Sequence, residues 1–175
     1  MGVAALTSDP RFRAPLVVLT ALILHLAVLS RVRVAGVMPD IMLLLGIAAG
    51  LTGGPSRGAA VGFVSGMALD LFLQTPLGLS ALVFTLVGFA VGTLETGILR
   101  ASWWIPVVTA LVASAAGEFL FALIGTMVGE TAMISPRLGV IAAIVGVGNA
   151  ILAPIVVRVV GWSVARAPSK GLFVV

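Results

Sequence analysis

Apolar runs long enough to form membrane helices recur along the whole chain, and they leave no room for a soluble domain of useful size. Of the 175 residues, 61% are hydrophobic and 9% are charged, and the mean hydropathy is +1.27. An ordinary soluble domain has about 25% charged residues. The sequence therefore predicts an all-α polytopic membrane protein with a single, membrane-embedded domain.

The apolar runs divide into six predicted transmembrane helices in a compact bundle, at about 14–30, 39–52, 58–73, 79–99, 105–128 and 138–160. This gives a cytoplasmic N-terminal tail over 1–13, a transmembrane domain over 14–163 and a cytoplasmic C-terminal tail over 164–175. The second helix begins at Pro39 and Asp40 and reaches only about 20 Å, whereas the hydrocarbon core is about 30 Å thick. We expect it either to be packed against its neighbours or to be extended by the residues before it.

Basic residues predict the orientation of the six helices, because an even number of spans puts both termini on the same side. With the N-terminus in the cytoplasm, seven basic residues fall on the inner side: Arg11, Arg13, Arg57, Arg100, Arg158, Arg166 and Lys170. Three fall on the outer side: Arg31, Arg33 and Arg137. Cytoplasmic segments carry an excess of Lys and Arg, so this distribution favours two cytoplasmic termini.

Composition and motifs argue against several classes of function. The chain has no cysteine and one histidine, which leaves no disulfide, no thiol chemistry and no plausible zinc cluster. The net charge of +4 comes from arginines at predicted helix ends, and a basic stripe with interleaved aromatics is absent, so no nucleic-acid partner is expected. Hydrolase, metalloprotease and P-loop motifs are missing as well. We expect no enzymatic activity, no cofactor and no metal.

Glycines recur every four residues in the stretch Arg57–Gly78. This spacing puts three glycines and one acid on the same face of a helix: Gly58, Gly62, Gly66 and Asp70. The next span carries Gly88 and Gly92 on one face, and the turn between the two spans contains Pro76 and Gly78. Small residues let membrane helices approach closely, so we expect the two helices to form an antiparallel hairpin.

Three acids in the predicted membrane helices are weighed as functional groups: Asp70, Glu95 and Glu118. Asp70 lies near the outer end of its helix, and Glu118 lies near the middle of the fifth. Buried carboxylates in a bilayer are commonly neutral or paired with a donor from another helix. The sequence does not choose among the candidate donors, which are Ser114, Thr126, Asn149 and Ser65.

Three roles for these acids stay open: a polar contact between helices or with a partner's helix, a ligand pocket, and proton coupling. The first is favoured, because polar side chains commonly hold membrane helices together. A protease pair is disfavoured, because neither acid has a matching motif context. Glu95 lies near Arg100 and is interpreted as a surface charge. His25 is interpreted as a structural histidine in preference to a proton carrier.

The order of these features resembles the MreD family of rod shape-determining membrane proteins. The matching elements are the helix start at Pro39-Asp40, a short Gly-Pro-Arg-Gly-type turn, Gly62-Phe63 with Gly66 and Asp70, the turn Pro76-Leu77-Gly78, and Gly88 with Gly92. The resemblance covers the whole length in span number and hydrophobicity. Beyond Gly92 no motif matches, so any role for Glu118 or Asn149 rests on the residues alone.

The resemblance implies a non-enzymatic component of the bacterial cell-elongation machinery in the inner membrane. Its expected partners are an MreC-like bitopic membrane protein, the actin-like MreB, and the glycosyltransferase and transpeptidase of lateral peptidoglycan synthesis. The family is also thought to resemble the substrate-binding subunits of energy-coupling factor transporters. That likeness would place Asp40, Asp70 and the turn at 74–78 around one outward-facing cavity.

Two hypotheses follow from these features. In the first, the chain is a scaffold whose glycine-lined faces bind the transmembrane helix of MreC. In the second, it is a substrate-capture subunit for a vitamin or a lipid-linked precursor, and its acids line a pocket. The residues expected to form the partner or pocket face are Asp40, Gly58, Gly62, Gly66, Asp70, Pro76, Gly78, Gly88, Gly92, Glu118 and Asn149.

Overall fold

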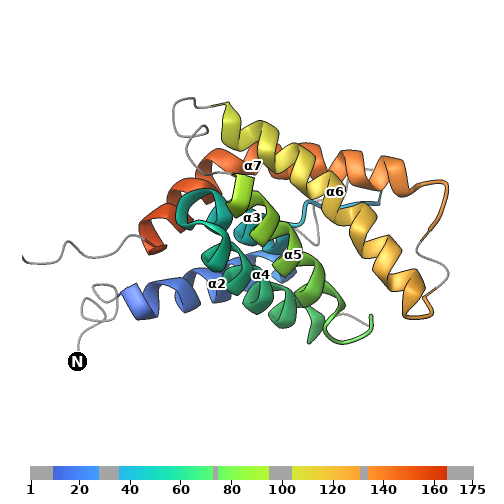
Figure 1. Ribbon diagram of the computed structural model, residues 1–175, viewed down its shortest axis with the longest axis horizontal. Helices are drawn as coiled ribbons and strands as arrows, with labels where there is room; N and C mark the ends of the chain where they lie inside the picture. Colours follow the sequence, from blue (N-terminus) through green and yellow to red (C-terminus); the bar gives the residue numbers. More distant parts are fainter. Residues whose placement is uncertain (1–9, 28–35, 73–74, 95–103, 131–133, 165–175) are drawn as a thin grey trace, which may run out of the picture.

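All regular structure in the described part of the chain is helical. The computed structural model describes residues 10–27, 36–72, 75–94, 104–130 and 134–164. They form the helices α2 (Pro10–Ala27), α3 (Ile41–Gly53), α4 (Pro55–Asp70), α5 (Leu79–Leu94), α6 (Ile105–Met127) and α7 (Leu138–Val164) (Figure 1). The predicted all-α class is confirmed. The predictions for Glu95 and Arg100 lie outside the described residues.

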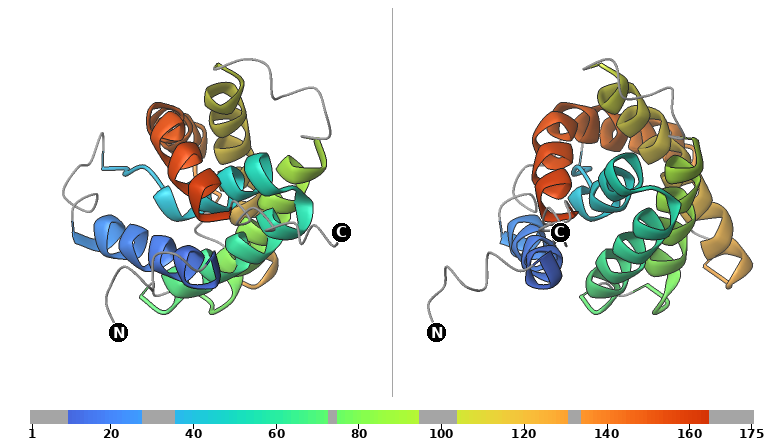
Figure 2. Two further views of the ribbon diagram at one scale, coloured as in Figure 1. Left: turned by 90° about the vertical axis from the view of Figure 1, so that its left-hand side faces the viewer. Right: turned by 60° about the vertical axis from the view of Figure 1, so that its left-hand side comes forward.

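Helix α3 lies at the centre of the molecule. Residues 41–51 are all buried, and α3 contacts each of the five other helices. The other five form a ring in which α2, α4, α5, α6 and α7 follow one another and α7 returns to α2 (Figure 2). A helix that is apolar on every side is normally buried by its neighbours, as α3 is here. The first of the two alternatives for this short helix is therefore the observed one: it is packed against its neighbours.

Two of the described helices are long and apolar enough to cross a membrane, judged by length and composition. They are Ile105–Met127 and Leu138–Ser163, with mean hydropathies of 2.1 and 2.5. Three shorter segments are also apolar: Arg13–Ala27, Ile41–Gly53 and Leu79–Leu94. The structure thus contains the six expected helices, and two of them have the length and composition to cross a bilayer.

Three helix starts differ from the predicted ones. Helix α2 begins at Pro10, inside the segment predicted as a tail. Helix α3 begins one residue after Asp40, which is its N-cap. Helix α4 begins at Pro55, because Gly54 alone links it to α3 at a φ of +82°. Glycine reaches this left-handed conformation without steric cost, and proline suits the first helical position, so the predicted turn at 52–58 shrinks to a single residue.

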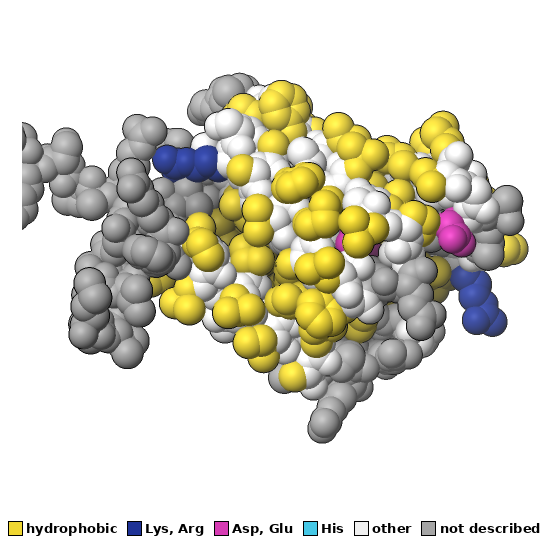
Figure 3. Space-filling model, turned by 90° about the horizontal axis from the view of Figure 1, so that it is seen from below, with side chains coloured by type: hydrophobic (Ala, Val, Ile, Leu, Met, Phe, Trp, Pro, Cys, Tyr) yellow, Lys and Arg dark blue, Asp and Glu magenta, His cyan; other side chains and the backbone are white. Residues whose placement is uncertain are grey.

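The start of α2 lies beside the end of α7. The Arg13 guanidinium carbon is 4.8 Å from the centroid of the Trp162 ring, an arrangement in which the cation is attracted to the electron-rich face. The basic side chains visible in Figure 3 lie toward the two ends of the molecule, and apolar side chains cover the surface between them. The end of the bundle away from the Arg13–Trp162 contact holds the end of α2, the start of α3 and the turn between α4 and α5.

Candidate functional site

The glycine face of α4 is covered by α5 of the same chain. A Cβ atom built on Gly66 would lie 2.5 Å from the carbonyl oxygen of Ser80, and one on Gly92 would lie 2.5 Å from Pro55. Gly58 and Gly62 meet the backbone of α5 just as closely. The predicted hairpin is confirmed. The prediction that this face binds a partner's transmembrane helix is wrong, because no room is left between α4 and α5.

Asp70 holds the same hairpin together at its turn. Its side chain is 3% exposed, and its two carboxylate oxygens accept the backbone N–H groups of Gly78 at 2.9 Å and of Ser80 and Ala81 at 3.2 Å each. The first N–H groups of a helix lack partners within the helix and favour a negative charge. Asp70, at the end of α4, therefore caps α5 and does not line a cavity, contrary to the expectation.

The rest of the turn is built around this cap. Gly78 adopts a φ of +95°, which favours glycine, and the carbonyl of Pro76 accepts the N–H of Leu79 at 3.1 Å. Pro76 and Gly78 thus shape the entry into α5. Together with Gly58, Gly62, Gly66, Gly88 and Gly92, they belong to the α4–α5 contact.

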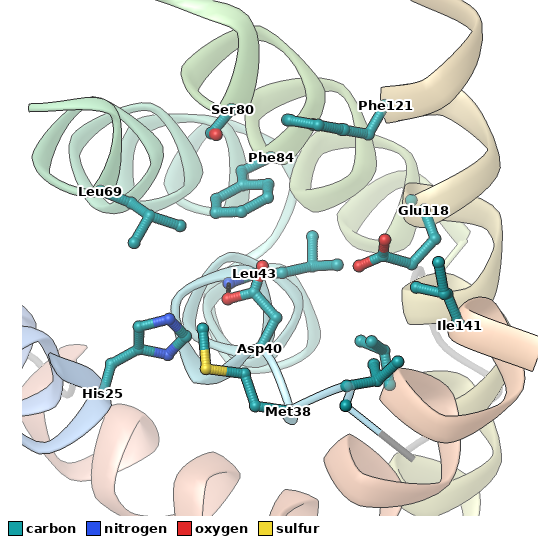
Figure 4. A pocket seen from close by; sticks show the side chains of 14 residues that line it. His25, Met38, Asp40, Leu43, Leu69, Ser80, Phe84, Glu118, Phe121 and Ile141 are labelled. Atoms are coloured by element: carbon teal, nitrogen blue, oxygen red, sulfur yellow. Dashed lines mark hydrogen bonds between the residues drawn. The ribbon is translucent and has the colours of Figure 1, made fainter. Parts of the chain in front are cut away.

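A cavity of about 340 Å³ lies at the end of the bundle where α3 begins. It is bounded by α2, α3, α5, α6 and α7, with Leu69 from α4 (Figure 4). Its wall is formed by His25, Gly36, Val37, Met38, Asp40, Leu43, Leu69, Ser80, Phe84, Gly117, Glu118, Phe121, Ile141 and Val145. Of the predicted site residues, only Asp40 and Glu118 line it.

Asp40 is positioned by both its side chain and its backbone. Its Oδ1 accepts the N–H groups of Met42 at 3.0 Å and Leu43 at 3.1 Å, which is the N-cap arrangement. Its carbonyl oxygen accepts the Asn149 side-chain amide at 2.9 Å, and the same amide donates to Ser114 Oγ at 2.9 Å. Asn149 therefore ties the start of α3 to α6 and α7.

The donors proposed for the acids have other partners. Asn149 and Ser114 bond to each other, Ser65 Oγ donates to the carbonyl of Gly62, and Thr126 Oγ1 donates to the carbonyl of Leu123. None of these hydrogen bonds involves the Glu118 carboxylate. Glu118 is half-buried and points from α6 into the cavity (Figure 4).

Two further polar side chains complete one side of the cavity. His25 is 3% exposed and Ser80 is 1% exposed. Within the described part of the chain, neither His25 Nδ1 nor Ser80 Oγ has a hydrogen-bond partner. Sequence reasoning assigned His25 a structural role and did not single out Ser80, because a serine in the first turn of an apolar helix is common. The available signal for Ser80 was its position after the turn that follows Asp70, because Asp70 accepts N–H groups from the start of α5 and so fixes how this helix begins.

The remaining wall is apolar and includes two aromatic rings, Phe84 and Phe121. A polar group on one side and an apolar lining elsewhere are typical of small-ligand sites. Among residues 10–27, 36–72, 75–94, 104–130 and 134–164, no three metal-binding side chains lie close enough to hold an ion.

A strongly apolar, all-helical chain with two membrane-capable helices is typical of a helical membrane protein. The family model of the rod shape-determining protein MreD matches residues 10–158, and the chain belongs to this family. Its role is therefore in the determination of rod shape. No curated protein and no solved structure shows significant similarity to the chain, so the likeness to energy-coupling factor transporters has no support from a solved structure.

Proposed function

We propose that the chain is a non-enzymatic, multi-pass component of the bacterial inner membrane that holds an MreC-like bitopic protein and the peptidoglycan synthases together during cell elongation. The match to the MreD family over residues 10–158 carries this proposal. All six helices cross the bilayer and both termini are cytoplasmic. The contact between Arg13 and Trp162, which brings the first and last helices together at one end, supports an even number of passes.

The short helices can be accommodated within this arrangement. Helix α3 has 13 residues and α4 and α5 have 16 each, which correspond to about 20 to 24 Å against a hydrocarbon core of about 30 Å. Local thinning of the bilayer compensates for a short hydrophobic stretch at a modest cost. Helix α3 is shielded from lipid by its neighbours, so its length matters least.

An apolar groove between α5 and α6 is the proposed docking surface for the transmembrane helix of the MreC-like partner. Its volume is about 720 Å³, and its wall consists of Leu86, Val87, Phe89, Ala90, Val91, Leu94, Val108, Thr109, Val112, Ala113, Ala116 and Leu120. Small side chains let a second helix approach closely, and Ala90, Ala113 and Ala116 supply them. Only a segment that satisfies its own backbone hydrogen bonds can occupy such a groove within lipid, which favours a helix.

Filling the groove tests the docking surface. Ala90→Phe and Ala116→Phe place a ring at two exposed positions of the groove, and Ala60→Phe places the same ring at an exposed position of α4 outside it. We expect co-purification of the MreC-like protein and rod shape to be lost in the first two variants and kept in the third. Full co-purification with both groove variants would refute docking at this surface.

The cavity supports a second candidate function, a substrate-capture subunit for a vitamin or lipid-linked precursor. The observation that favours this function is the space of about 340 Å³ next to the polar side chains of Asp40 and Glu118. Capture for transport requires an ATP-driven partner. Affinity purification from native membranes would then recover a transporter ATPase in place of shape-determining proteins, and recovery of only the latter would eliminate this candidate.

A further inference from the structure

All four polar side chains of the cavity can accept hydrogen bonds. Asp40 and Glu118 contribute carboxylates, Ser80 contributes a hydroxyl oxygen and His25 contributes a ring nitrogen. Figure 4 shows that they reach the cavity from four different elements: α2, the start of α3, α5 and α6. The fold thus brings together, around the cavity, four hydrogen-bond acceptors that lie far apart between residues 25 and 118 of the sequence.

The side chains around the cavity include more acids than bases. Two carboxylates face it, His25 is the basic side chain in its lining, and none of its lining residues is Lys or Arg. An acid at this depth normally pairs with a positive group or a hydrogen-bond donor. His25 Nδ1 and Ser80 Oγ also lack partners among the described residues although both side chains are almost fully buried. Buried polar atoms usually have a partner, so the site lacks a hydrogen-bonding group that these two atoms could bond.

The apolar part of the cavity wall limits the size and polarity of a ligand that the cavity can hold. Leu43, Phe84 and Phe121 lie among the polar side chains: Leu43 is between Asp40 and Glu118, and Phe84 is beside Ser80 (Figure 4). Aromatic faces attract cations, and a volume of about 340 Å³ is near the lower end of the range for small-ligand sites. The occupant is therefore a compact cation with a short body.

We propose that this cavity binds a primary ammonium group, held by Asp40 and Glu118 and hydrogen-bonded to Ser80 and His25. An ammonium group has three N–H donors and no acceptor, which suits a site with two carboxylates and two further side chains that can accept. A quaternary ammonium could satisfy the charge but would leave the acceptors without hydrogen bonds. A phosphate or carboxylate alone would be repelled by the two acids.

The ammonium group can come from a free amine or from the headgroup of phosphatidylethanolamine. A lysine of a partner's helix would offer the same chemistry, but the small volume and the position at one end of the bundle favour a small molecule or headgroup. The proposal concerns a site away from the α5–α6 groove and does not depend on the scaffold function.

Native mass spectrometry of the purified full-length protein in detergent tests the site. Phosphatidylethanolamine, phosphatidylcholine and phosphatidylglycerol with identical acyl chains are titrated separately, and the apparent Kd of each is measured. Free ethanolamine and its neutral analogue ethylene glycol are then added as competitors. Competition by ethanolamine alone means that the ammonium suffices, whereas no competition means that the lipid is the source.

Two substitutions remove the proposed charges with little change in shape. Asp40→Asn keeps the helix cap, because asparagine is an equally good N-cap residue, and Glu118→Gln keeps the side-chain length. Glu130→Gln is the matched control, since Glu130 is exposed and lies outside the cavity wall. Thermal melting of each variant verifies folding before lipid is added.

We expect phosphatidylethanolamine to bind at least tenfold more tightly than the other two lipids. Asp40→Asn and Glu118→Gln should each weaken it about tenfold, and Glu130→Gln should leave it unchanged. Equal affinity for the three lipids without binding of ethanolamine would overturn the proposal, as would equal losses in Glu118→Gln and Glu130→Gln. Loss of MreC-like co-purification in the groove variants with ammonium binding intact separates this site from the scaffold function.

Discussion

Asp70 and Gly78 are joined across the turn between α4 and α5: the Gly78 N–H donates to Asp70 Oδ2 at 2.9 Å. The same carboxylate also accepts two N–H groups from the first turn of α5. A side chain that ends one helix thus caps the next. Both oxygens are engaged, so the carboxylate, and not merely a polar side chain, is needed at this position.

Asp70→Asn is expected to lower stability by about 2 to 4 kcal/mol, because hydrogen bonds to a charged group contribute about 1.5 to 3 kcal/mol each and an amide nitrogen cannot accept the N–H groups facing it. Asp40→Asn is the matched control, since Asn serves as well as Asp at an N-cap. Thermal unfolding in detergent measures both. A melting temperature for Asp70→Asn as high as that for Asp40→Asn would show that the cap is unimportant.

Gly66→Ala is expected to force α4 and α5 apart. The new Cβ would lie 2.5 Å from the Ser80 carbonyl oxygen and 2.6 Å from the Ala81 Cα, both of which are backbone atoms that cannot turn aside. Overpacking of this kind costs about 1 to 3 kcal/mol or more. Gly139→Ala is the control, because nothing lies within 4 Å of its Cβ position. The comparison is made by thermal unfolding and by yield from membranes, and equal behaviour of the two variants would contradict the packing.

The hairpin could be predicted from the sequence because its signals are local. Glycines four residues apart share a helix face whatever the rest of the chain does, and Pro76 with Gly78 indicates a turn. The identity of the helix covering Gly66 is also local, since α5 follows directly. The spacing did not reveal that α5 covers the whole glycine face of α4 and leaves none of it for another helix.

The cavity could not be predicted in the same way, because its residues come together only through the ring of helices around α3. Asn149 reaches Asp40 across 109 positions of sequence and Ser114 across 35. Asp70 and Ser80 differ by ten positions, yet one caps a helix and the other faces the cavity. These outcomes depend on how each helix is rotated, which follows from packing and not from spacing.

Asn149→Ala is expected to destabilise the protein by about 1 to 3 kcal/mol, because it removes the donor to the buried Ser114 hydroxyl and one of the two donors to the Asp40 carbonyl, which keeps the Leu44 N–H. Ser163→Ala should cost little, because Ser163 Oγ only donates within its own helix. A double-mutant cycle with Ser114→Ala measures the coupling between the two side chains. Strict additivity of the single changes would mean that the bond contributes nothing.

The six-pass orientation can be tested by labelling, because the chain contains no cysteine and any introduced thiol is unique. Ser56 and Glu130 are both exposed, and they lie next to the α3–α4 and α6–α7 connections. With cytoplasmic termini, Ser56→Cys faces the cytoplasm and Glu130→Cys faces outward. We expect a membrane-impermeant maleimide to label Glu130→Cys in intact spheroplasts and Ser56→Cys only after permeabilisation. Labelling of both cysteines in intact spheroplasts would refute the crossings between them, and the reverse pattern would invert the orientation.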